Sequence, residues 1–252
     1  MLLGKVTDTQ DTTGTVLEEH LVEVTEEQVK EAVFSFTGEY MQVPPMYSAL
    51  KVNGKKLCDL ARAGVTVERQ ARPVQLYSIE IIKMELPRVC MRVRCSKGTY
   101  IRTLCQDIGE KLSCGACMES LLRTKVSEFC VQDALRLSEI EERVQKAAGQ
   151  TPSEQWNAEM FDFIYAVDSV FLQYKKAVIC KEWNKLLYNG NRMKKDMFVS
   201  YQKDWEQQKV RIYDEEGRFI GIYEYSEIHG DYKPVNCLWK HEISEKYNRI
   251  LY

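Results

Sequence analysis

RVCMRVRCSKGTYIRTLCQDIGEK spans residues 88–111 and joins a strand pattern to a helix pattern through one short turn. Apolar and polar residues alternate strictly over 88–95, so one side of this segment is apolar and the other carries three arginines. From residue 101 onward the apolar residues recur at helical spacing. The turn at 96–100 therefore lies where a strand ends and a helix begins, a place where ligand sites are common.

Neighbouring segments continue this mixture of helices and strands. Thr25 to Gln28 form a capping box that starts a helix, and Gly38 is placed to end it. The spacing over 56–63 predicts a short helix, and β-branched residues over 74–82 predict a strand.

The C-terminal half has a different character. A second capping box, Ser138-Glu139-Ile140-Glu141, starts a charged helix that runs to about residue 148, and 149–153 indicate a linker. A short helix is expected at 183–188. Strand patterns at 210–213 and 219–225 flank an acidic turn with a glycine, which predicts a hairpin. The tail is rich in Tyr and Trp and indicates a small β-rich domain.

Composition places the chain among ordinary globular proteins. Its 252 residues are 44% hydrophobic and 29% charged, and no stretch approaches the ~20 apolar residues that span a bilayer. The first residues have too short an apolar run for a signal peptide, so the expected location is cytoplasmic. The nine cysteines are an odd number in a long chain, which favours reduced thiols over a disulfide framework.

The net charge of −2 hides a basic region. Residues 41–130 hold 15 Lys+Arg and 8 Asp+Glu, a net of +7, and the remainder holds 20 basic and 29 acidic residues, a net of −9. A basic region inside an acidic protein fits a face that contacts phosphates. A solvated surface that happens to be basic is the alternative.

The turn Ser96 to Arg102 is the best candidate for chemistry. Gly98 permits a positive φ and the close approach of a ligand, and Tyr100 is able to stack on a base. Arg102 stands in the first turn of a helix, where a cation opposes the helix dipole, so we expect an anionic partner. A lysine–glycine turn with an exposed arginine is the plainer interpretation of the spacing.

A second candidate is the proline-stiffened loop over 44–55, which is able to present Lys51, Lys55 and Lys56 to phosphates. As a bare pattern it is weak.

Two other patterns suggest chemistry less strongly. Cys114 and Cys117 have CxxC spacing, but zinc needs four ligands, no second pair follows, and the three histidines are dispersed. A thiol or zinc enzyme built on this pair stays open as a minor hypothesis. Asp8 and Asp11 suggest paired carboxylates, although the surrounding threonines fit turn chemistry better.

Four blocks in order carry a family resemblance: LGKVTDTQDTTG (3–14), PMYSALKVNGK (45–55) with ARAG (61–64) and RPV (72–74), KGTYIRTLCQDIG (97–109), and LLRT (121–124) with Phe129. Together they resemble the TruB family of bacterial tRNA pseudouridine synthases, densely over residues 3 to about 135. Residues 167–240 resemble the C-terminal PUA-like domain of that family more loosely.

The resemblance implies the isomerisation of uridine 55 in the T-loop of tRNA to pseudouridine. An aspartate attacks the flipped-out nucleotide, the C–N glycosidic bond breaks, the uracil rotates and a C–C bond forms. The resemblance implies no metal and no organic cofactor, and it implies a tRNA T-arm as partner, a monomer and no membrane association. Attack on the ring and attack on the sugar both stay open.

The resemblance also assigns residues. Arg102 is implied to pair with the nucleophilic aspartate, and Tyr100 and Leu121 are implied to line the uracil pocket. The RNA-binding residues expected from the basic region and the motifs are Lys51, Lys55, Arg92, Arg94, Lys97 and Arg123.

Three departures from the family pattern are present. Cys117 stands where the family usually has histidine, and Leu122 stands where it usually has arginine. The "GTLDP" motif that carries the nucleophile lies upstream of the first block in the family, and nothing in this chain matches it. We therefore expect an N-terminally truncated, inactive chain in which Arg102 has lost its counter-ion.

The expected fold is α+β: a mixed, antiparallel-rich β-sheet with flanking helices, left incomplete with an open edge. Residues 1–150 are expected to form the synthase domain and 167–252 a small PUA-like β domain. A non-catalytic tRNA-binding or tRNA-folding protein derived from the same family is the main alternative, because it would need no nucleophile.

Overall fold

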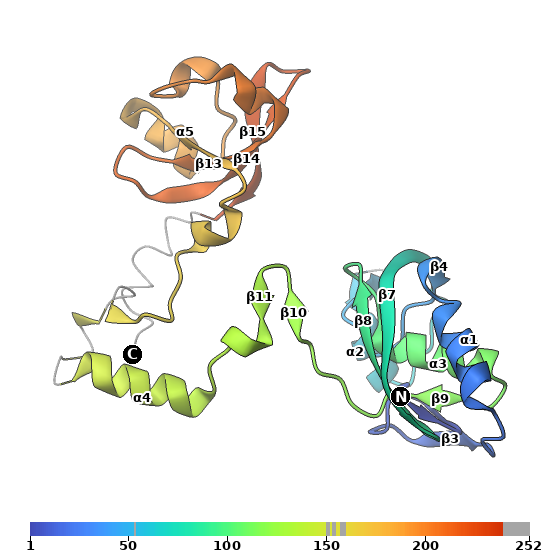
Figure 1. Ribbon diagram of the computed structural model, residues 1–252. Helices are drawn as coiled ribbons and strands as arrows, with labels where there is room; N and C mark the ends of the chain where they lie inside the picture. The colour runs from blue at the N-terminus through green and yellow to red at the C-terminus, as the bar shows by residue number, and fades with distance from the viewer. Residues whose placement is uncertain (53, 150–151, 153–154, 157–159, 239–252) are drawn as a thin grey trace. The chain divides into compact units, whose positions relative to one another are not determined.

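The computed structural model describes residues 1–52, 54–149, 152, 155–156 and 160–238 and has an α+β fold. It consists of two compact units that divide at Arg123–Thr124 (Figure 1). This division comes earlier than the domain boundary expected near residue 150. Asn53, in the expected lysine–asparagine–glycine turn, and most of the expected linker lie outside the described residues.

A five-stranded antiparallel sheet is the frame of the first unit. Its strand order is β4-β7-β8-β1-β9. The long pair at its centre runs from Leu76 opposite Cys95 to Glu85 opposite Arg88, and its register shifts after Leu76 and after Ile81. The strands are β1 (Leu2–Leu3), β4 (Gly38–Gln42), β7 (Arg72–Glu85), β8 (Arg88–Cys95) and β9 (Ala116–Cys117).

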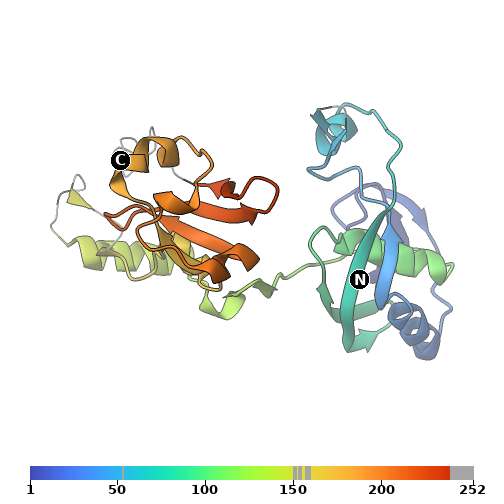
Figure 2. The same cartoon turned by 90° about the horizontal axis from the view of Figure 1, so that it is seen from above.

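Helices α1 (Glu26–Phe34) and α3 (Ile101–Lys111) pack on one face of this sheet (Figure 2). The core between them contains fully buried Val33, Leu76 and Leu104. Apolar residues of β8 face this core and its arginines face outward, so the alternation predicted over 88–95 is confirmed.

The expected start of α1 is confirmed and its expected end is wrong. The Thr25 hydroxyl accepts from the Gln28 amide, and Gln28 Oε1 accepts from the Thr25 amide, which completes the capping box. The helix is capped at Ser35. Gly38 instead opens β4 with a φ of 109°, a conformation that favours glycine.

Smaller elements complete the first unit. Strands β2 (Lys5–Thr7) and β3 (Val16–Glu19) form one hairpin, and β5 (Lys51–Val52) and β6 (Lys55–Lys56) form another. The second hairpin leads directly into α2 (Leu57–Arg62), close to the short helix predicted there.

The second unit is built on a four-stranded sheet in the order β12-β13-β14-β15. Its strands are β12 (Lys175–Val178), β13 (Lys209–Tyr213), β14 (Phe219–Ser226) and β15 (Asp231–Cys237). The predicted β13–β14 hairpin is confirmed. Buried Asp214 holds its turn by accepting hydrogen bonds from the Arg218 amide and the Tyr188 hydroxyl.

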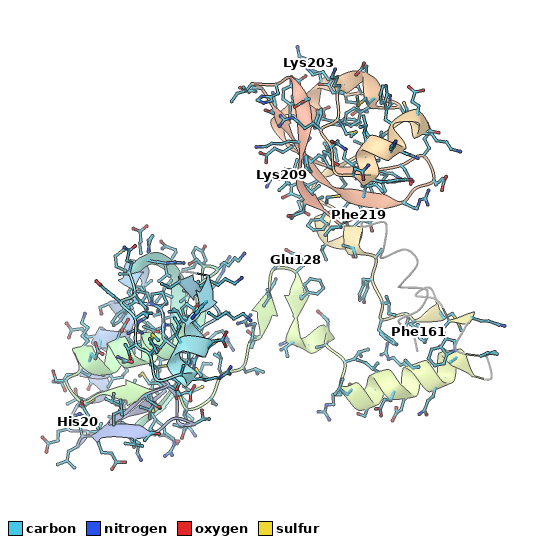
Figure 3. All side chains as sticks on the ribbon, turned by 180° about the vertical axis from the view of Figure 1, so that it is seen from behind. His20, Glu128, Phe161, Lys203, Lys209 and Phe219 are labelled. Carbon is cyan, nitrogen blue, oxygen red and sulfur yellow. The ribbon has the colours of Figure 1, made fainter. Side chains whose placement is uncertain are left out.

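A separate hairpin, β10 (Lys125–Val126) and β11 (Phe129–Cys130), begins this unit, with Glu128 at its turn (Figure 3). The other elements are α4 (Leu137–Ala148), α5 (Asn184–Tyr188) and short 3-10 helices at Val131–Asp133, Val167–Phe171, Lys181–Trp183, Lys195–Met197 and Lys203–Gln207.

The predicted cap of α4 is wrong by two residues. The cap position is Arg136, whose amide donates to the Glu139 carboxylate at 2.6 Å. Glu139, three residues after the cap position, therefore caps the start of the helix by accepting this hydrogen bond. Ser138 lies inside the helix. Across the described part of the chain, helices are too short or too polar to traverse a bilayer.

Candidate functional site

The turn between β8 and α3 has the conformation that its sequence predicts. Gly98 has a φ of 90°. The Thr99 hydroxyl donates to the Ser96 carbonyl at 2.9 Å, and the Ser96 hydroxyl accepts from the Gln75 amide of β7 at 3.0 Å. Side-chain hydrogen bonds thus fasten the turn to the neighbouring strand.

Arg102 projects from the first turn of α3 and ties three segments together. Its Nη1 donates to Asp11 Oδ2 at 3.1 Å and to the Thr9 carbonyl at 3.2 Å, and its Nη2 donates to the Tyr47 carbonyl at 2.7 Å. The side chains of Arg102 and Asp11 are only 24% and 16% exposed. The expectation that Arg102 is left without a counter-ion is wrong, because a carboxylate of the 3–14 block reaches it.

Asp11 is prepared for this pairing by its own loop. Its Oδ1 accepts from the Thr13 amide at 3.1 Å, the Thr13 hydroxyl at 2.5 Å and the Thr9 hydroxyl at 2.9 Å, which leaves Oδ2 for Arg102. Burial acts to raise the pKa of the Asp11 carboxyl, but these hydrogen bonds outweigh it and the pKa lies below its ordinary value. The turn chemistry predicted for this loop is present and also orients the carboxylate.

Tyr100 is held by a residue that the sequence analysis missed. Gln42, at the end of β4, is 1% exposed. Its Oε1 accepts from the Tyr100 amide at 2.8 Å, and its Nε2 donates to the Tyr100 carbonyl at 3.1 Å. The signal in the sequence was a polar residue at an inward strand position, directly before Val43-Pro44-Pro45.

Leu121 and Arg123 lie in the segment that ends the first unit, outside any strand or helix. The Leu121 side chain is 55% exposed. Within the described residues, the Arg123 side chain makes no hydrogen bond or ion pair.

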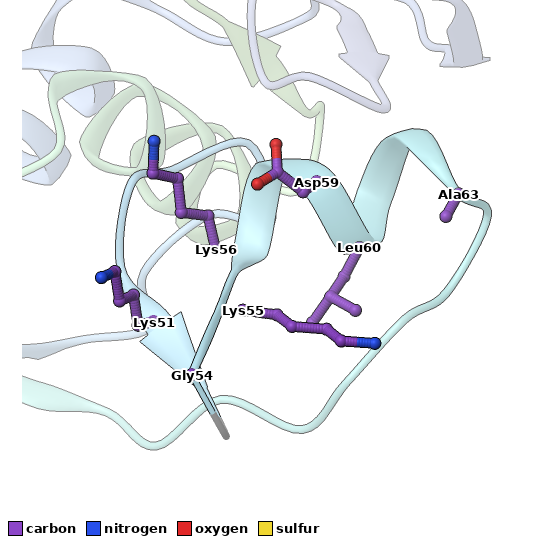
Figure 4. Close-up of a pocket in the computed structure, with 7 residues that line it drawn as sticks. All are labelled: Lys51, Gly54, Lys55, Lys56, Asp59, Leu60 and Ala63. Atoms are coloured by element: carbon purple, nitrogen blue, oxygen red, sulfur yellow. The ribbon is translucent and has the colours of Figure 1, made fainter.

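The expected basic loop forms an open pocket of about 510 Å³ (Figure 4). Lys51 and Lys56 extend to one side, whereas Lys55 runs beneath Leu60 to the other. None of the three lysines forms an ion pair with another described residue. The lining consists of Lys51, Gly54, Lys55, Lys56, Asp59, Leu60 and Ala63.

The arginine face of β8 is less basic than its sequence suggests. Arg92 Nη1 donates to Glu80 Oε2 of β7 at 2.6 Å, and the Arg94 guanidinium lies 5.6 Å from the centre of the Tyr77 ring. Lys97, in the following turn, is exposed.

Two further groups of titratable residues have perturbed surroundings. Burial raises the pKa of the Cys114 and Cys117 thiols, which disfavours the reactive thiolate. No group of His, Cys, Asp or Glu among the described residues is arranged to hold a metal ion, so the zinc hypothesis lacks a ligand set there. Burial, with a smaller contribution from Glu110, raises the pKa of Asp107 to about 6.

Two family models match consecutive segments of the chain, which together span residues 1–172. The TruB family pseudouridylate synthase (N terminal domain) matches residues 1–101, and the tRNA pseudouridylate synthase B C-terminal domain matches residues 102–172. A solved structure described as a Cbf5-Nop10-Gar1 complex is similar with a TM-score of 0.60 and 18% identity, over 88% of this chain and 65% of that one. That likeness supports the fold alone.

Curated relatives share much higher identity. A "tRNA pseudouridine synthase B" of Lachnoclostridium phytofermentans is 47% identical in an alignment 214 residues long, which covers 81% of this chain and 66% of the relative. A protein of the same name from Clostridium acetobutylicum is 38% identical over 227 residues, 90% of this chain and 73% of the relative. The chain spans about two thirds of the length of the first of these relatives. By this similarity, the chain belongs to the TruB family of pseudouridylate synthases.

Proposed function

We propose that the protein acts on tRNA as a pseudouridine-55 synthase, an isomerase that converts the T-loop uridine to pseudouridine. The observation that carries this proposal is the Arg102–Asp11 pair beside Tyr100 at the β8–α3 turn, in a chain of this family. Fixed charges at such a junction suit electrostatic stabilisation of a reacting group, since they need no reorganisation during the reaction.

Each site residue has a proposed role. Tyr100 stacks on the flipped base and Leu121 covers it. Arg102 holds the nucleophilic aspartate of the family's GTLDP motif, which these 252 residues do not contain, and Asp11 fixes the guanidinium. Phosphates are contacted by Lys51, Lys55, Arg92, Arg94, Lys97 and Arg123.

We infer that no aspartate in the matched blocks is the nucleophile. Asp8 Oδ1 accepts from the Thr15 amide at 2.7 Å, and Asp11 is engaged by two threonines and Arg102. Asp107 belongs to the 97–109 block, outside the family motif that carries the nucleophile, and burial raises its pKa to about 6. Covalent catalysis needs a free carboxylate in the base pocket, and we therefore expect no turnover from these 252 residues alone.

A non-catalytic tRNA-binding or tRNA-folding role is the second candidate. The specific observation in its favour is that Asp8 and Asp11 are both engaged by other groups, so neither is a free carboxylate that could attack a nucleotide. Binding would then be the whole function, with the same T-arm as ligand.

We also propose that residues 167–252 are the PUA-like domain and 1–150 the synthase domain. The β12–β15 sheet with its own buried core supports the first assignment. The buried thiols of Cys105, Cys114 and Cys117 form no disulfide, which suits the proposed cytoplasmic location. We propose that the protein binds tRNA as a monomer.

Binding to a T-arm hairpin tests the proposed substrate. The protein should prefer a hairpin with the T-loop uridine over one of equal length with a scrambled loop. Tyr100→Ala should weaken T-arm binding by about 1–3 kcal/mol, the usual value of a base–aromatic stack. Tyr165→Ala, at an exposed tyrosine of the second unit, is the matched control and should change affinity little. Equal affinity for both hairpins would contradict the proposal.

A further inference from the structure

The start of helix α3 lacks the capping residue that such a position normally has. Tyr100 occupies the cap position with a φ of −102° and a ψ of 109°, and its side chain caps no amide. Yet the first turn of this helix carries Arg102, whose guanidinium makes three hydrogen bonds that require the helix backbone at this residue to be held in place. Some other group must hold the helix start in place.

Gln42 makes that connection. Its carboxamide donates to the carbonyl and accepts from the amide of the same residue, Tyr100, at 3.1 and 2.8 Å. A side-chain amide has one acceptor and donors spaced like those of a peptide group, so it is able to pair with a backbone as a strand would. The side chain is 1% exposed, so water does not compete for these two bonds.

Tyr40 fixes which way the amide points. The second Nε2 proton of Gln42 has the Tyr40 hydroxyl as acceptor. The Tyr40 ring in turn packs edge-on against Phe36, with the ring centres 5.3 Å apart. The packed Phe36–Tyr40 pair therefore restrains the Gln42 carboxamide through the Tyr40 hydroxyl.

We propose that Gln42 is a positioning residue. It fixes the backbone conformation of Tyr100 and, through it, the backbone position from which the Arg102 side chain extends. It touches neither the base nor the reacting atoms. The consequence for RNA rests on the proposed function, because Tyr100 matters to a ligand only if it meets the base. The backbone clamp itself is independent of that function.

Amide hydrogen exchange at single residues tests the clamp in the full chain. Gln42→Met removes both hydrogen bonds at similar volume, and the Tyr100 amide should exchange about tenfold faster. Gln42→Glu puts a buried carboxylate against the Tyr100 carbonyl, so the Tyr100 amide should exchange at least as fast as in Gln42→Met. Tyr40→Phe, which leaves Gln42 in place, should accelerate Tyr100 exchange about twofold to threefold and serves if both Gln42 variants fail to fold.

Val29→Ala in α1 is the control for a merely structural effect. Val29 is fully buried in the same unit and has no described bond to Tyr100, so its variant should accelerate exchange throughout the core. The Gln42 variants should instead leave α1 amides unchanged. Unchanged exchange at Tyr100, or equal acceleration in α1, would overturn the proposal.

A second measurement separates the clamp from the proposed function. Gln42→Met should weaken T-arm hairpin binding about tenfold, and it should add little to Tyr100→Ala in the double variant, because both act through one ring. Full additivity would contradict the positioning role. Faster exchange at Tyr100 with unchanged RNA affinity would confirm the clamp and contradict the role of Tyr100 in base binding.

Discussion

Arg102 shows how one side chain organises this site. Its guanidinium has donors in a planar fork, and they reach a carboxylate and two carbonyls from loops far apart in the sequence. A lysine has a single ammonium and would not satisfy Asp11 and Tyr47 together. The loops of the first unit that meet at this residue are therefore coupled through it.

Asp11→Asn should lower the free energy of unfolding at pH 7 by about 1–3 kcal/mol, since it removes a charged partner from several hydrogen bonds. The pKa of Asp11 lies below its ordinary 3.8 in the folded protein, so its stabilisation is present above that value and is lost as the pH falls. Denaturation of the parent and of Asp11→Asn should therefore be compared from pH 7 to pH 3. The difference between their free energies of unfolding should become smaller as the pH falls. Asp8→Asn, without a described cation partner, is the control.

Asp107→Asn should have the opposite pH dependence. The pKa of Asp107 rises from 3.8 to about 6 on folding, so the folded state binds its proton more tightly and loses stability as the pH rises through that window. The variant should gain about 1 kcal/mol over the parent between pH 4 and pH 7, a figure reduced for solvent screening. Glu110→Gln should give a smaller gain in stability, because Glu110 contributes less than burial to the raised pKa of Asp107. A parent that stays equally stable across this range would show that Asp107 is not perturbed.

At the scale of elements, the outer face of β8 is less basic than its sequence pattern predicts. Alternation places Arg92 and Arg94 outside, but β7 brings Glu80 opposite Arg92 and the Tyr77 ring within 5.6 Å of the Arg94 guanidinium. Cross-strand neighbours come from another part of the chain, so the pattern of one strand does not reveal them. The β5–β6 hairpin, in contrast, carries lysines without ion pairs in the described structure.

Lys51→Ala with Lys55→Ala should reduce the salt dependence of tRNA binding more than Arg92→Ala with Arg94→Ala. Each phosphate contact contributes about 0.7–0.9 to the log–log salt slope, and Glu80 already neutralises Arg92. Affinity measured from 50 to 200 mM salt gives the slopes. Lys194→Ala with Lys195→Ala, in the other unit, is the control. A larger decrease of the salt slope for the Arg92 and Arg94 variant would contradict this expectation and would support β8 as the main phosphate-binding face.

Local signals predicted much of the fold, and their limits are visible in particular residues. The alternation of β8, the capping box at Thr25 and the β13–β14 hairpin depend on neighbours in sequence, and all three are confirmed. Gly38 and Ser138 were misplaced because several residues nearby are able to end or start a helix. The partners of Arg102 and the role of Gln42 depend on contacts across 55 residues or more, which periodicity does not encode.

At the scale of the whole molecule, the described residues form two separate hydrophobic cores. Leu104 belongs to one and Ile212 to the other, and each is fully buried. Leu104→Ala and Ile212→Ala should each cost about 2–5 kcal/mol, the usual cost of deleting large buried side chains. Their effects should add in the double variant, because the two cores share no residue. Urea unfolding followed by residue-specific probes would show coupling instead if the two units formed one cooperative core.

Tritium release from T-arm RNA labelled at C5 of uridine tests the central claim most directly. Three proteins should be compared: the 252-residue chain, the relative from Lachnoclostridium phytofermentans, and that relative with its matching segment replaced by residues 1–172 of this chain. The proposed site predicts release by the relative and by the chimera, loss of release when the chimera carries Arg102→Lys, and no release by the chain alone. A chimera that unfolds cooperatively but releases no tritium, or a chain that releases tritium by itself, would contradict the account.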